Sequence, residues 1–386
     1  MKVANTRKVN ERIVQYMSRE QLNSLLGMGL SAPVSVDEII FEEPAKLLSY
    51  AEHFRSNMEQ NGLHYTEDQS VIASMVMSVL EETVGDPQKV APAILDEIFK
   101  NGHIFHKGEL ESNPYYQNIH FDSQKSGRFE LSMASFRKYE LFMYDTPKDR
   151  FQGVMIPSIG TIDHRFKFPN IKENGSAWMS ITPNEIYTMQ KPIEDASGKV
   201  LTLGCGMGYF AYMVALKDNV EHVTIIEKQS EVIELFNEFI LPQFSCKDKI
   251  TVIQADAFDY METLSDGEYD FCFVDIWKGS NDTVPYLKMK KLCSRFKKTA
   301  LSYWIEDALI ATIIGFVYMI ILEEFYKNQN IDAPQVSDLP EDEAYKLEYL
   351  KDLLRDAEIT RPEHVDYYMD YHNIMYIISC RGHYDN

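Results

Sequence analysis

Short apolar runs alternate with amphipathic, helix-like segments in a regular order between residues 199 and 307. The runs are rich in Val, Ile, Leu or Phe and are bounded by polar residues or glycine, a pattern that predicts buried strands. The predicted strands cover residues 200–203, 223–226, 250–254, 269–274 and 300–305. Strands that alternate with helices are typical of an α/β fold built on a parallel sheet.

The first hundred residues have a helical pattern instead. Apolar residues recur there at helical spacing, and the Asp86-Pro87 pair suits a helix start because proline is tolerated in the first turn. The expected helices cover residues 36–60, 66–84 and 86–100. This part of the chain is therefore predicted to be mostly helical.

The pattern changes again between about residues 105 and 170, where short aromatic and β-branched runs predict a small antiparallel β unit. Its strands are expected at residues 129–131, 139–144 and 154–156. A chain of 386 residues is too long for one compact core. We therefore expect a first domain over residues 1–172, which ends in the β unit, and a second domain over residues 173–386.

Three patterns follow the last strand of the alternating region. Residues 308–322 form a long apolar run flanked by acids, which predicts a buried core helix because a bilayer span needs roughly twenty apolar residues. Residues 336–357 are acidic and helical, and we expect a solvated insertion there. Two alternating runs, 365–371 and 374–380, predict a terminal β-hairpin.

The strand at 200–203 runs into a glycine-rich turn with the spacing G-x-G-x-G, formed by Gly204, Gly206 and Gly208. Bare backbone of this kind can approach a ligand closely. A dinucleotide-binding fingerprint would place its third glycine one residue later, where this chain has Tyr209. The turn therefore predicts a nucleotide-type ligand but not a dinucleotide.

Acidic side chains follow the next three strands. Glu227 ends the second strand roughly twenty residues after the glycines, the distance expected for an acid that binds ribose hydroxyls. Asp256 and Ala257 follow the third strand, and Asp275 and Trp277 follow the fourth. Open α/β sheets bind ligands at the carboxyl ends of their strands, so these residues are candidates for one site.

The glycine loop and these acids resemble the motifs of class I S-adenosylmethionine-dependent methyltransferases, over about residues 178–381. The resemblance implies a doubly wound α/β fold with a seven-stranded sheet, whose antiparallel last strand would come from the predicted hairpin. It implies S-adenosyl-L-methionine as cofactor, with Glu227 on the ribose and Asp256 on the adenine amino group. The residues after the fourth strand would face the methyl donor.

The cofactor-binding residues that follow from this resemblance are Gly204, Cys205, Gly206, Gly208, Tyr209, Glu227, Lys228, Asp256, Ala257, Asp275 and Trp277. Asp275 is also the candidate catalytic residue, since a carboxylate can orient an acceptor amine or hydroxyl or take its proton. It could equally serve as a hydrogen-bond partner of the cofactor. Trp277 offers a dry aromatic lining for a sulfonium, or it packs in the core.

The segment from Trp178 to Glu185 leads into the first strand of the alternating region. Thr182 is the expected helix cap, Pro183 fits the first helical position and Glu185 would complete a capping box. Related enzymes place this part of the chain over the methionine end of the cofactor. The segment is therefore either a plain helix start or a cover for the ligand.

Two other functions remain open. The motifs around Glu227 and Asp256 are also similar to those of spermidine synthase-type aminopropyltransferases. That family carries an acid where this chain has Met207, and a second Asp soon after the first where this chain reads Trp277-Lys278-Gly279. A third possibility, from outside the enzymes, is a regulatory protein that binds an adenosyl ligand without turnover.

Charge and cysteine content restrict the partners. The formal net charge of −21 argues against nucleic acid as a partner, and the basic run at residues 288–298 is expected to be a solvated helix face. Five cysteines without a C-x-x-C pair, and no apolar leader, predict a reducing, cytoplasmic location without a zinc site. His103 and His106 lack a carboxylate framework at sequence level, so no metal is expected. The acceptor would be a small molecule or peptide-like, with no membrane partner.

Overall fold

The computed structural model describes residues 1–31, 44–151, 153–331 and 341–380. It divides into two compact units, which we describe separately. The sheet unit comprises residues Gln21–Asp256 and Tyr269–Phe273, and the helical unit comprises Met1–Glu20, Ala257–Glu268 and Val274–Asn386.

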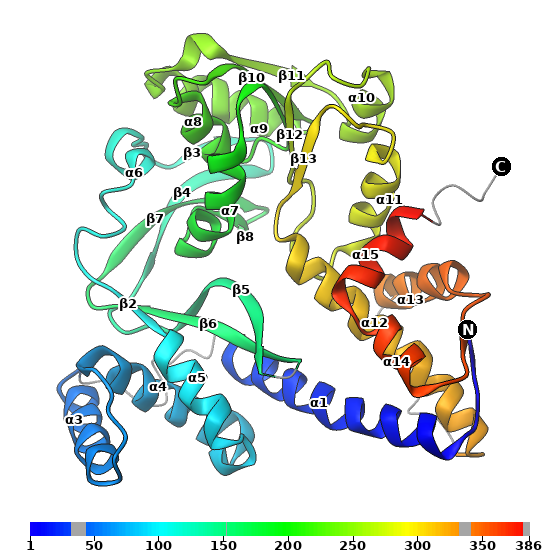
Figure 1. The fold of residues 1–386 in the computed structure, drawn as a ribbon. Coiled ribbons are helices and arrows are strands. Elements are labelled where there is room, and N and C mark those ends of the chain that lie inside the picture. The colour runs from blue at the N-terminus through cyan, green and yellow to red at the C-terminus, as the bar shows by residue number, and fades with distance from the viewer. Residues whose placement is uncertain (32–43, 152, 332–340, 381–386) are drawn as a thin grey trace. The chain divides into compact units, whose positions relative to one another are not determined.

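The largest sheet has the strand order β11-β10-β9-β12-β13 (Figure 1). Strand β13 (Ala300–Tyr303) belongs to the helical unit, and the other strands belong to the sheet unit, apart from Val274 at the end of β12. Those in the sheet unit are β9 (Gly198–Leu203), β10 (Val220–Glu227), β11 (Ile250–Gln254) and β12 (Phe271–Val274). Strand β10 pairs in parallel with β9 and β11, in a register that sets Ile226 opposite Leu203 and Glu227 opposite Gln254. The carboxyl ends of these three strands therefore meet at one edge of the sheet.

Helices follow these strands as the sequence predicts. Helix α8 (Tyr209–Ala215) follows β9, and α9 (Ser230–Leu235) follows β10 and continues into a π-helical turn at Phe236–Ile240. Both helices pack on β10, whose core residues Val223 and Ile225 are fully buried. The α/β architecture is thus confirmed and is consistent with a Rossmann-like fold.

Two smaller sheets precede this region in the sheet unit. One is antiparallel with the order β3-β4-β7-β8, and the other has the order β2-β6-β5. Their strands are β2 (His103–Phe105), β3 (Gln124–Ser126), β4 (Phe129–Phe136), β5 (Phe142–Phe151), β6 (Val154–Ile162), β7 (Phe166–Glu173) and β8 (Ser176–Ser180). The predicted β unit is present, although β2 pairs with β6 in parallel. The domain boundary predicted near residue 172 falls within the β7–β8 hairpin, and a division at that point stays a prediction.

The helices of the sheet unit form a core of their own. Helices α3 (Pro44–Gln60), α4 (Glu67–Val84) and α5 (Pro92–Asn101) bury Leu47, Ile72 and Ile98 in one apolar cluster, which also includes Ile156 of β6. Thr66 caps α4 in a capping box with Gln69. Helix α4 lies within its predicted range, and α3 lies within the described part of its range, since residues 36–43 are outside the described residues. The third predicted helix begins later than the Asp86-Pro87 pair suggests, because residues 87–89 form a separate 3-10 turn and α5 begins at Pro92. Two shorter elements, η1 (Pro87–Lys89) and α6 (Pro114–Asn118), complete this part.

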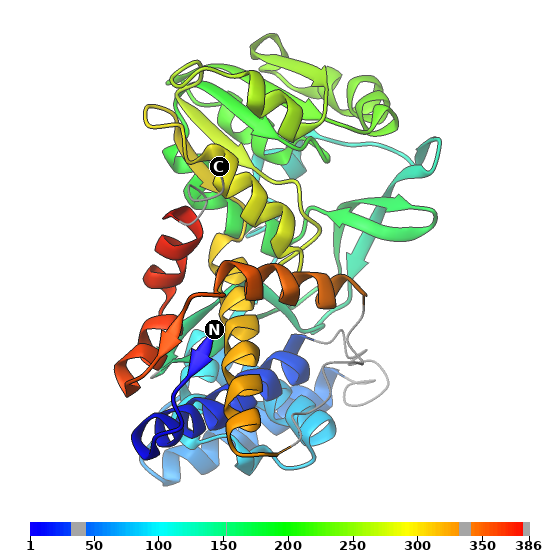
Figure 2. The same ribbon diagram turned by 90° about the vertical axis from the view of Figure 1, so that its right-hand side faces the viewer.

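The helical unit is organised around α12 (Glu306–Asn328), with α13 (Glu341–Leu353) crossing it in Figure 2. The other elements are α10 (Ala257–Thr263), α11 (Thr283–Cys293), β13 (Ala300–Tyr303), α14 (Pro362–Tyr368), α15 (Tyr371–Cys380) and a parallel pair of short strands, β1 (Lys2–Val3) and β14 (Glu358–Ile359). Helix α1 (Arg7–Ser31) begins in this unit and continues into the sheet unit.

Helix α12 is the one helix of the described chain that is long and apolar enough to cross a membrane by length and composition. Half of its most apolar window is buried inside the protein, including Leu309, Ile313 and Ile321. This burial agrees with the core helix predicted from the sequence.

The predicted terminal hairpin is wrong, because both of its runs are helical. In α14 and the turn after it, Val365 and Met369 are buried four residues apart, and in α15 the buried residues are Ile374, Ile377 and Ile378. These are the i, i+3 and i+4 spacings of a helix rather than the period of two of a strand. In the described part of the chain the largest sheet therefore has five strands, and the seven-stranded form with an antiparallel last strand is not seen.

The acidic segment before the C-terminus also differs from expectation. Leu347, Leu350 and Leu354 are almost fully buried, so α13 packs one apolar face in the helical unit and is not a solvated insertion. The first part of that prediction, residues 336–340, lies outside the described residues.

Candidate functional site

The loop after β9 has a backbone that requires glycine. Gly204, Gly206 and Gly208 have φ values of +100°, +50° and +73°, the left-handed region that other residues rarely adopt. A Cβ on Gly208 would lie 2.3 Å from the Phe236 ring, and a Cβ on Gly206 would lie 2.5 Å from the Met179 sulfur. Gly208 thus admits a core ring, whereas Gly206 lies under the side chain of Met179, a residue of β8.

Glu227, at the end of β10, is joined directly to this loop. Its Oε2 accepts a hydrogen bond from the Cys205 amide at 3.1 Å, and its Oε1 accepts from the Lys228 and Gln229 amides at 2.8 Å each. The residue is only 7% exposed. Burial, together with the charge of Glu227, raises the pKa of the Cys205 thiol well above its ordinary value, so Cys205 stays a neutral thiol.

Asp256 lies across from the end of β10. Its Oδ2 accepts from the Lys228 ammonium at 2.9 Å, and the Ala255 amide donates to the Glu227 carbonyl. The structure therefore brings together the glycine loop, Glu227, Lys228 and Asp256 at one edge of the sheet. Tyr209, the first residue of α8, is buried beneath the loop, and burial raises its pKa to about 12.

The segment before α7 (Pro183–Asp195) covers the loop through Met179. Pro183 occupies the first helical turn as predicted. The predicted capping box is wrong, because the Thr182 side chain accepts no hydrogen bond from a backbone amide of α7. Thr182 is the N-cap residue only in the sense that its extended backbone precedes the first helical turn. Trp178 packs edge-on against Phe129 of β4, with ring centroids 5.0 Å apart.

Helix α6 also contacts the loop, which the sequence analysis did not predict. Tyr115 donates from its hydroxyl to the Met207 carbonyl at 2.7 Å, and Asn113 donates from Nδ2 to the Tyr209 hydroxyl at 2.9 Å. Tyr116 donates to the Ile181 carbonyl at 2.6 Å. The sequence contains a local signal for the helix itself, since an Asn-Pro pair before two tyrosines predicts a short capped helix. It contains no signal for the contact between this helix and the glycine loop.

Ala257, Asp275 and Trp277 belong to the helical unit. Ala257 is the first residue of α10, and Asp275, which is half-buried, directly follows β12. Trp277 is buried, donates from Nε1 to the Trp304 carbonyl at 3.1 Å, and lies against the rings of Tyr286 and Tyr303. Its observed contacts are therefore those of a packed aromatic cluster, and a role toward ligand stays a prediction for both Asp275 and Trp277.

The basic run at residues 288–298 was predicted to be solvated throughout, and one of its lysines is not. The Lys290 ammonium lies 2.6 Å from a Glu306 oxygen that also accepts from the Tyr286 hydroxyl at 2.7 Å, and it lies over the Tyr303 ring. The Lys290 side chain is only 16% exposed. The other lysines of the run, at positions 288, 291, 297 and 298, are exposed.

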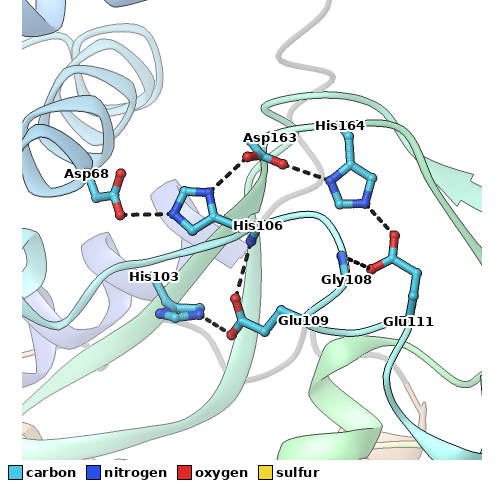
Figure 3. A network of polar contacts seen from close by, with 8 residues as sticks. All are labelled: Asp68, His103, His106, Gly108, Glu109, Glu111, Asp163 and His164. Carbon is cyan, nitrogen blue, oxygen red and sulfur yellow. Dashed lines mark hydrogen bonds and ion pairs between the residues drawn. The ribbon is translucent and has the colours of Figure 1, made fainter.

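His103 and His106 take part in a polar network that the sequence did not predict (Figure 3). His103 lies in β2, where its Nε2 is 2.6 Å from Glu109. His106 lies between Asp163 and Asp68, at 2.8 and 3.3 Å. Asp163 also contacts His164, which reaches Glu111 at 2.7 Å. Within the described ranges no group of three or more such side chains has the geometry to hold a metal.

This network predicts a pH-dependent contribution to folding stability. Hydrogen bonding to Asp163 and the charges of both acids raise the pKa of His106 above 6.5. That contribution is complete below about pH 6.5 and is lost as pH rises through the raised value. Burial raises the pKa of Asp163, but hydrogen bonds from His106 and His164 outweigh it and leave it below 3.8, so the contribution of Asp163 is lost only in stronger acid.

Urea unfolding of the parent protein and of His106→Gln measures this effect. The loss caused by the substitution should be ~0.2–1 kcal/mol at about pH 5.5, the size usual for an exposed ion pair, and smaller at about pH 8.5. His53, which is exposed on α3, serves as the control position: His53→Gln should show no such pH dependence. A larger loss for His106→Gln at the higher pH would contradict the assignment.

Comparison with known proteins agrees with this geometry. Residues 184–310 match the spermine/spermidine synthase domain. The resemblance of the strand-end motifs to spermidine synthase-like proteins is therefore confirmed. The matched region contains the glycine loop, Glu227, Asp256 and Asp275.

Solved structures that match parts of this chain include two spermidine synthases and a PRMT1 complex. Spermidine synthase from Thermotoga maritima is 17% identical, with 41% of this chain and 64% of that chain covered at a TM-score of 0.28. A spermidine synthase in complex with the transition state analogue AdoDATO is 16% identical, with 41% and 65% covered at 0.28. The Trypanosoma brucei PRMT1 enzyme–prozyme complex with AdoHcy is 15% identical, with 31% and 37% covered at 0.24. The chain thus spans just under two thirds of these spermidine synthases, and a comparison with curated proteins found no match.

Proposed function

We propose that the protein binds S-adenosyl-L-methionine on the glycine loop and transfers its methyl group to a small-molecule or peptide-like acceptor. The observation that carries this proposal is the hydrogen bond from the Cys205 amide to the Glu227 carboxylate. It fixes the acid of β10 against the loop of β9, which is the arrangement needed for one side chain to reach a ribose while bare backbone meets the rest of the ligand.

Glu227 has the capacity for such a ligand. A carboxylate oxygen offers about two lone pairs, and within the described part of the chain Oε2 accepts one hydrogen bond, from the Cys205 amide. A ribose hydroxyl, which is a donor, suits the remaining position. Asp256 would accept from the adenine amino group in the same way, beside the Lys228 ammonium that donates to its Oδ2.

The charge of the loop favours S-adenosyl-L-methionine over its decarboxylated form. Spermidine synthase-like loops carry an acid where this chain has Met207, and Met207 is fully buried. A loop without a carboxylate does not repel the methionine carboxylate of the donor.

The donor supplies an electrophilic methyl group on a sulfonium, and the protein has to hold donor and acceptor in line and exclude water. Asp275 is our candidate for the residue that orients the acceptor or takes its proton, on the ground that it directly follows a central strand of the sheet.

Aminopropyl transfer is a second candidate function, favoured by the match of residues 184–310 to the spermine/spermidine synthase domain. Two features weigh against it. The loop lacks its acid, and Lys278 and Gly279 stand where a second carboxylate would follow Asp275.

A product assay separates these functions. The purified protein is incubated with S-adenosyl-L-methionine, or with its decarboxylated form, and a metabolite and peptide pool, and the nucleoside products are identified by mass spectrometry. We expect S-adenosylhomocysteine from the first donor. Methylthioadenosine from the second would instead establish aminopropyl transfer. Binding of either donor without any product would indicate a regulatory protein, and the absence of binding would refute all three.

A further inference from the structure

Helix α6 holds the glycine loop from outside the region that matches the synthase domain. Asn113 caps the helix, since its Oδ1 accepts from the Tyr115 amide at 2.9 Å, and the same side chain donates to the Tyr209 hydroxyl at 2.9 Å. The Tyr115 hydroxyl donates to the Met207 carbonyl at 2.7 Å. A five-residue helix thus makes two polar contacts with the loop and with the first residue of α8.

The position of the Tyr115 hydroxyl is determined by packing. Its ring meets Tyr209, Tyr212 and Phe244 edge-on, with centroids 5.6, 5.8 and 6.4 Å away, and the residue is fully buried. Edge-to-face contacts of this kind restrict the ring to one orientation. Burial raises the pKa of the phenol well above its ordinary value, so the hydroxyl remains a hydrogen-bond donor.

Two of the hydrogen bonds that hold the loop therefore lie on either side of Gly206. Glu227 binds the Cys205 amide from the side of β10, and Tyr115 binds the Met207 carbonyl from the side of α6. Between these points lies Gly206, which is partly accessible and has a left-handed backbone. The conformation at Gly206 thus depends on both contacts, and only one of them comes from the sheet that supplies the loop.

We propose that Tyr115 and Asn113 are positioning residues for the donor, which hold the glycine loop in its ligand-binding conformation. This inference rests on the proposed function, because the ligand it concerns is the adenosyl donor. It adds that the segment before the synthase-like domain is part of the donor site, and that the isolated region 184–310 would bind the donor poorly.

The test uses the full chain and variants that remove single polar contacts. Tyr115→Phe keeps the ring and deletes the hydroxyl, and Asn113→Ser keeps a helix cap but is too short to reach Tyr209. We expect each to raise the dissociation constant for S-adenosylhomocysteine about five- to tenfold by calorimetry, the effect of one hydrogen bond. The matched control is Tyr65→Phe, which deletes a similar hydroxyl contact to Asp96 in the helical core. It should lower the melting temperature and leave the affinity unchanged.

Hydrogen–deuterium exchange of the loop peptide gives a second measurement that needs no ligand. Exchange at residues 204–209 should be faster in Tyr115→Phe than in the parent or in Tyr65→Phe. If the parent binds S-adenosylhomocysteine and both loop variants bind it equally well with unchanged exchange, the inference is overturned while the proposed function stands. If the parent does not bind, the proposed function fails, and the exchange data alone decide whether α6 holds the loop. If Tyr115→Phe fails to fold, Asn113→Ser carries the test.

Discussion

Gly206→Ala should weaken binding of S-adenosylhomocysteine at least tenfold, equivalent to about 1.4 kcal/mol. The new methyl group would lie 2.5 Å from the Met179 sulfur and 2.9 Å from its terminal carbon, so the Met179 side chain has to move away from the loop. The φ of +50° adds a cost of roughly 1–2 kcal/mol for any residue with a Cβ. We therefore expect a lower melting temperature as well as a lower affinity, which calorimetry and thermal unfolding measure separately.

Two comparisons make this prediction specific. In a Met179→Ala background the stability cost of Gly206→Ala should be smaller, because part of it comes from the contact between these two residues. Gly315, on helix α12, is the control glycine, since a Cβ there meets nothing within 4 Å. Gly315→Ala should stabilise the protein by about 0.5–1 kcal/mol and leave ligand binding unchanged. Unchanged affinity in Gly206→Ala would remove the loop from the proposed site.

Glu227→Gln should lower both the stability of the fold and its affinity for adenosyl ligands. The carboxylate accepts three backbone amides, and the glutamine NH₂ would face at least one of them as a second donor. A buried amide without its acceptor costs about 1–3 kcal/mol of folding free energy. Loss of a charged hydrogen bond to the ribose should raise the dissociation constant about ten- to 150-fold, equivalent to 1.5–3 kcal/mol.

Methylthioadenosine is the appropriate ligand for this measurement, because it contains the adenosine half that Glu227 is assigned to bind. Its affinity should fall by the same factor as that of S-adenosylhomocysteine. Glu221→Gln is the matched control, as Glu221 is exposed on the same strand. A folded Glu227→Gln protein that binds methylthioadenosine as tightly as the parent would falsify the ribose assignment.

The strands of the largest sheet could be predicted closely because each is a short apolar run bounded by glycine or polar residues. Strand β11 has the predicted bounds, and β9, β10, β12 and β13 differ from prediction by a few residues at their ends. Such runs are typical of strands, both of the buried inner strands β9 and β12 and of the partly exposed edge strand β11. The motifs of the glycine loop and of the acids could be recognised for a similar reason, because each motif consists of residues close together in sequence at the end of a strand.

Prediction failed where a short amphipathic run is compatible with both a strand and a helix. The C-terminal runs were compatible with either period, and helices α14 and α15 form because Val365 and Met369, and Ile374 and Ile378, bury one helical face. The acidic α13 was assigned to solvent on charge, yet three leucines at helical spacing bury it. The structure of such segments depends on which other elements of the fold are placed to cover their apolar face.

Between residues 199 and 307 the sequence by itself determined the order of strands and helices, the glycine turn and the presence of Glu227 and Asp256 at strand ends, since each depends on period or on local backbone chemistry. Only the tertiary structure decided which side chains meet at the loop. Cys205 and Glu227 are 22 residues apart, Tyr115 and Met207 are 92 apart, and Asn113 and Tyr209 are 96 apart. Hydrogen bonds over such separations form only after packing has placed both partners, and no local pattern in the chain encodes that choice.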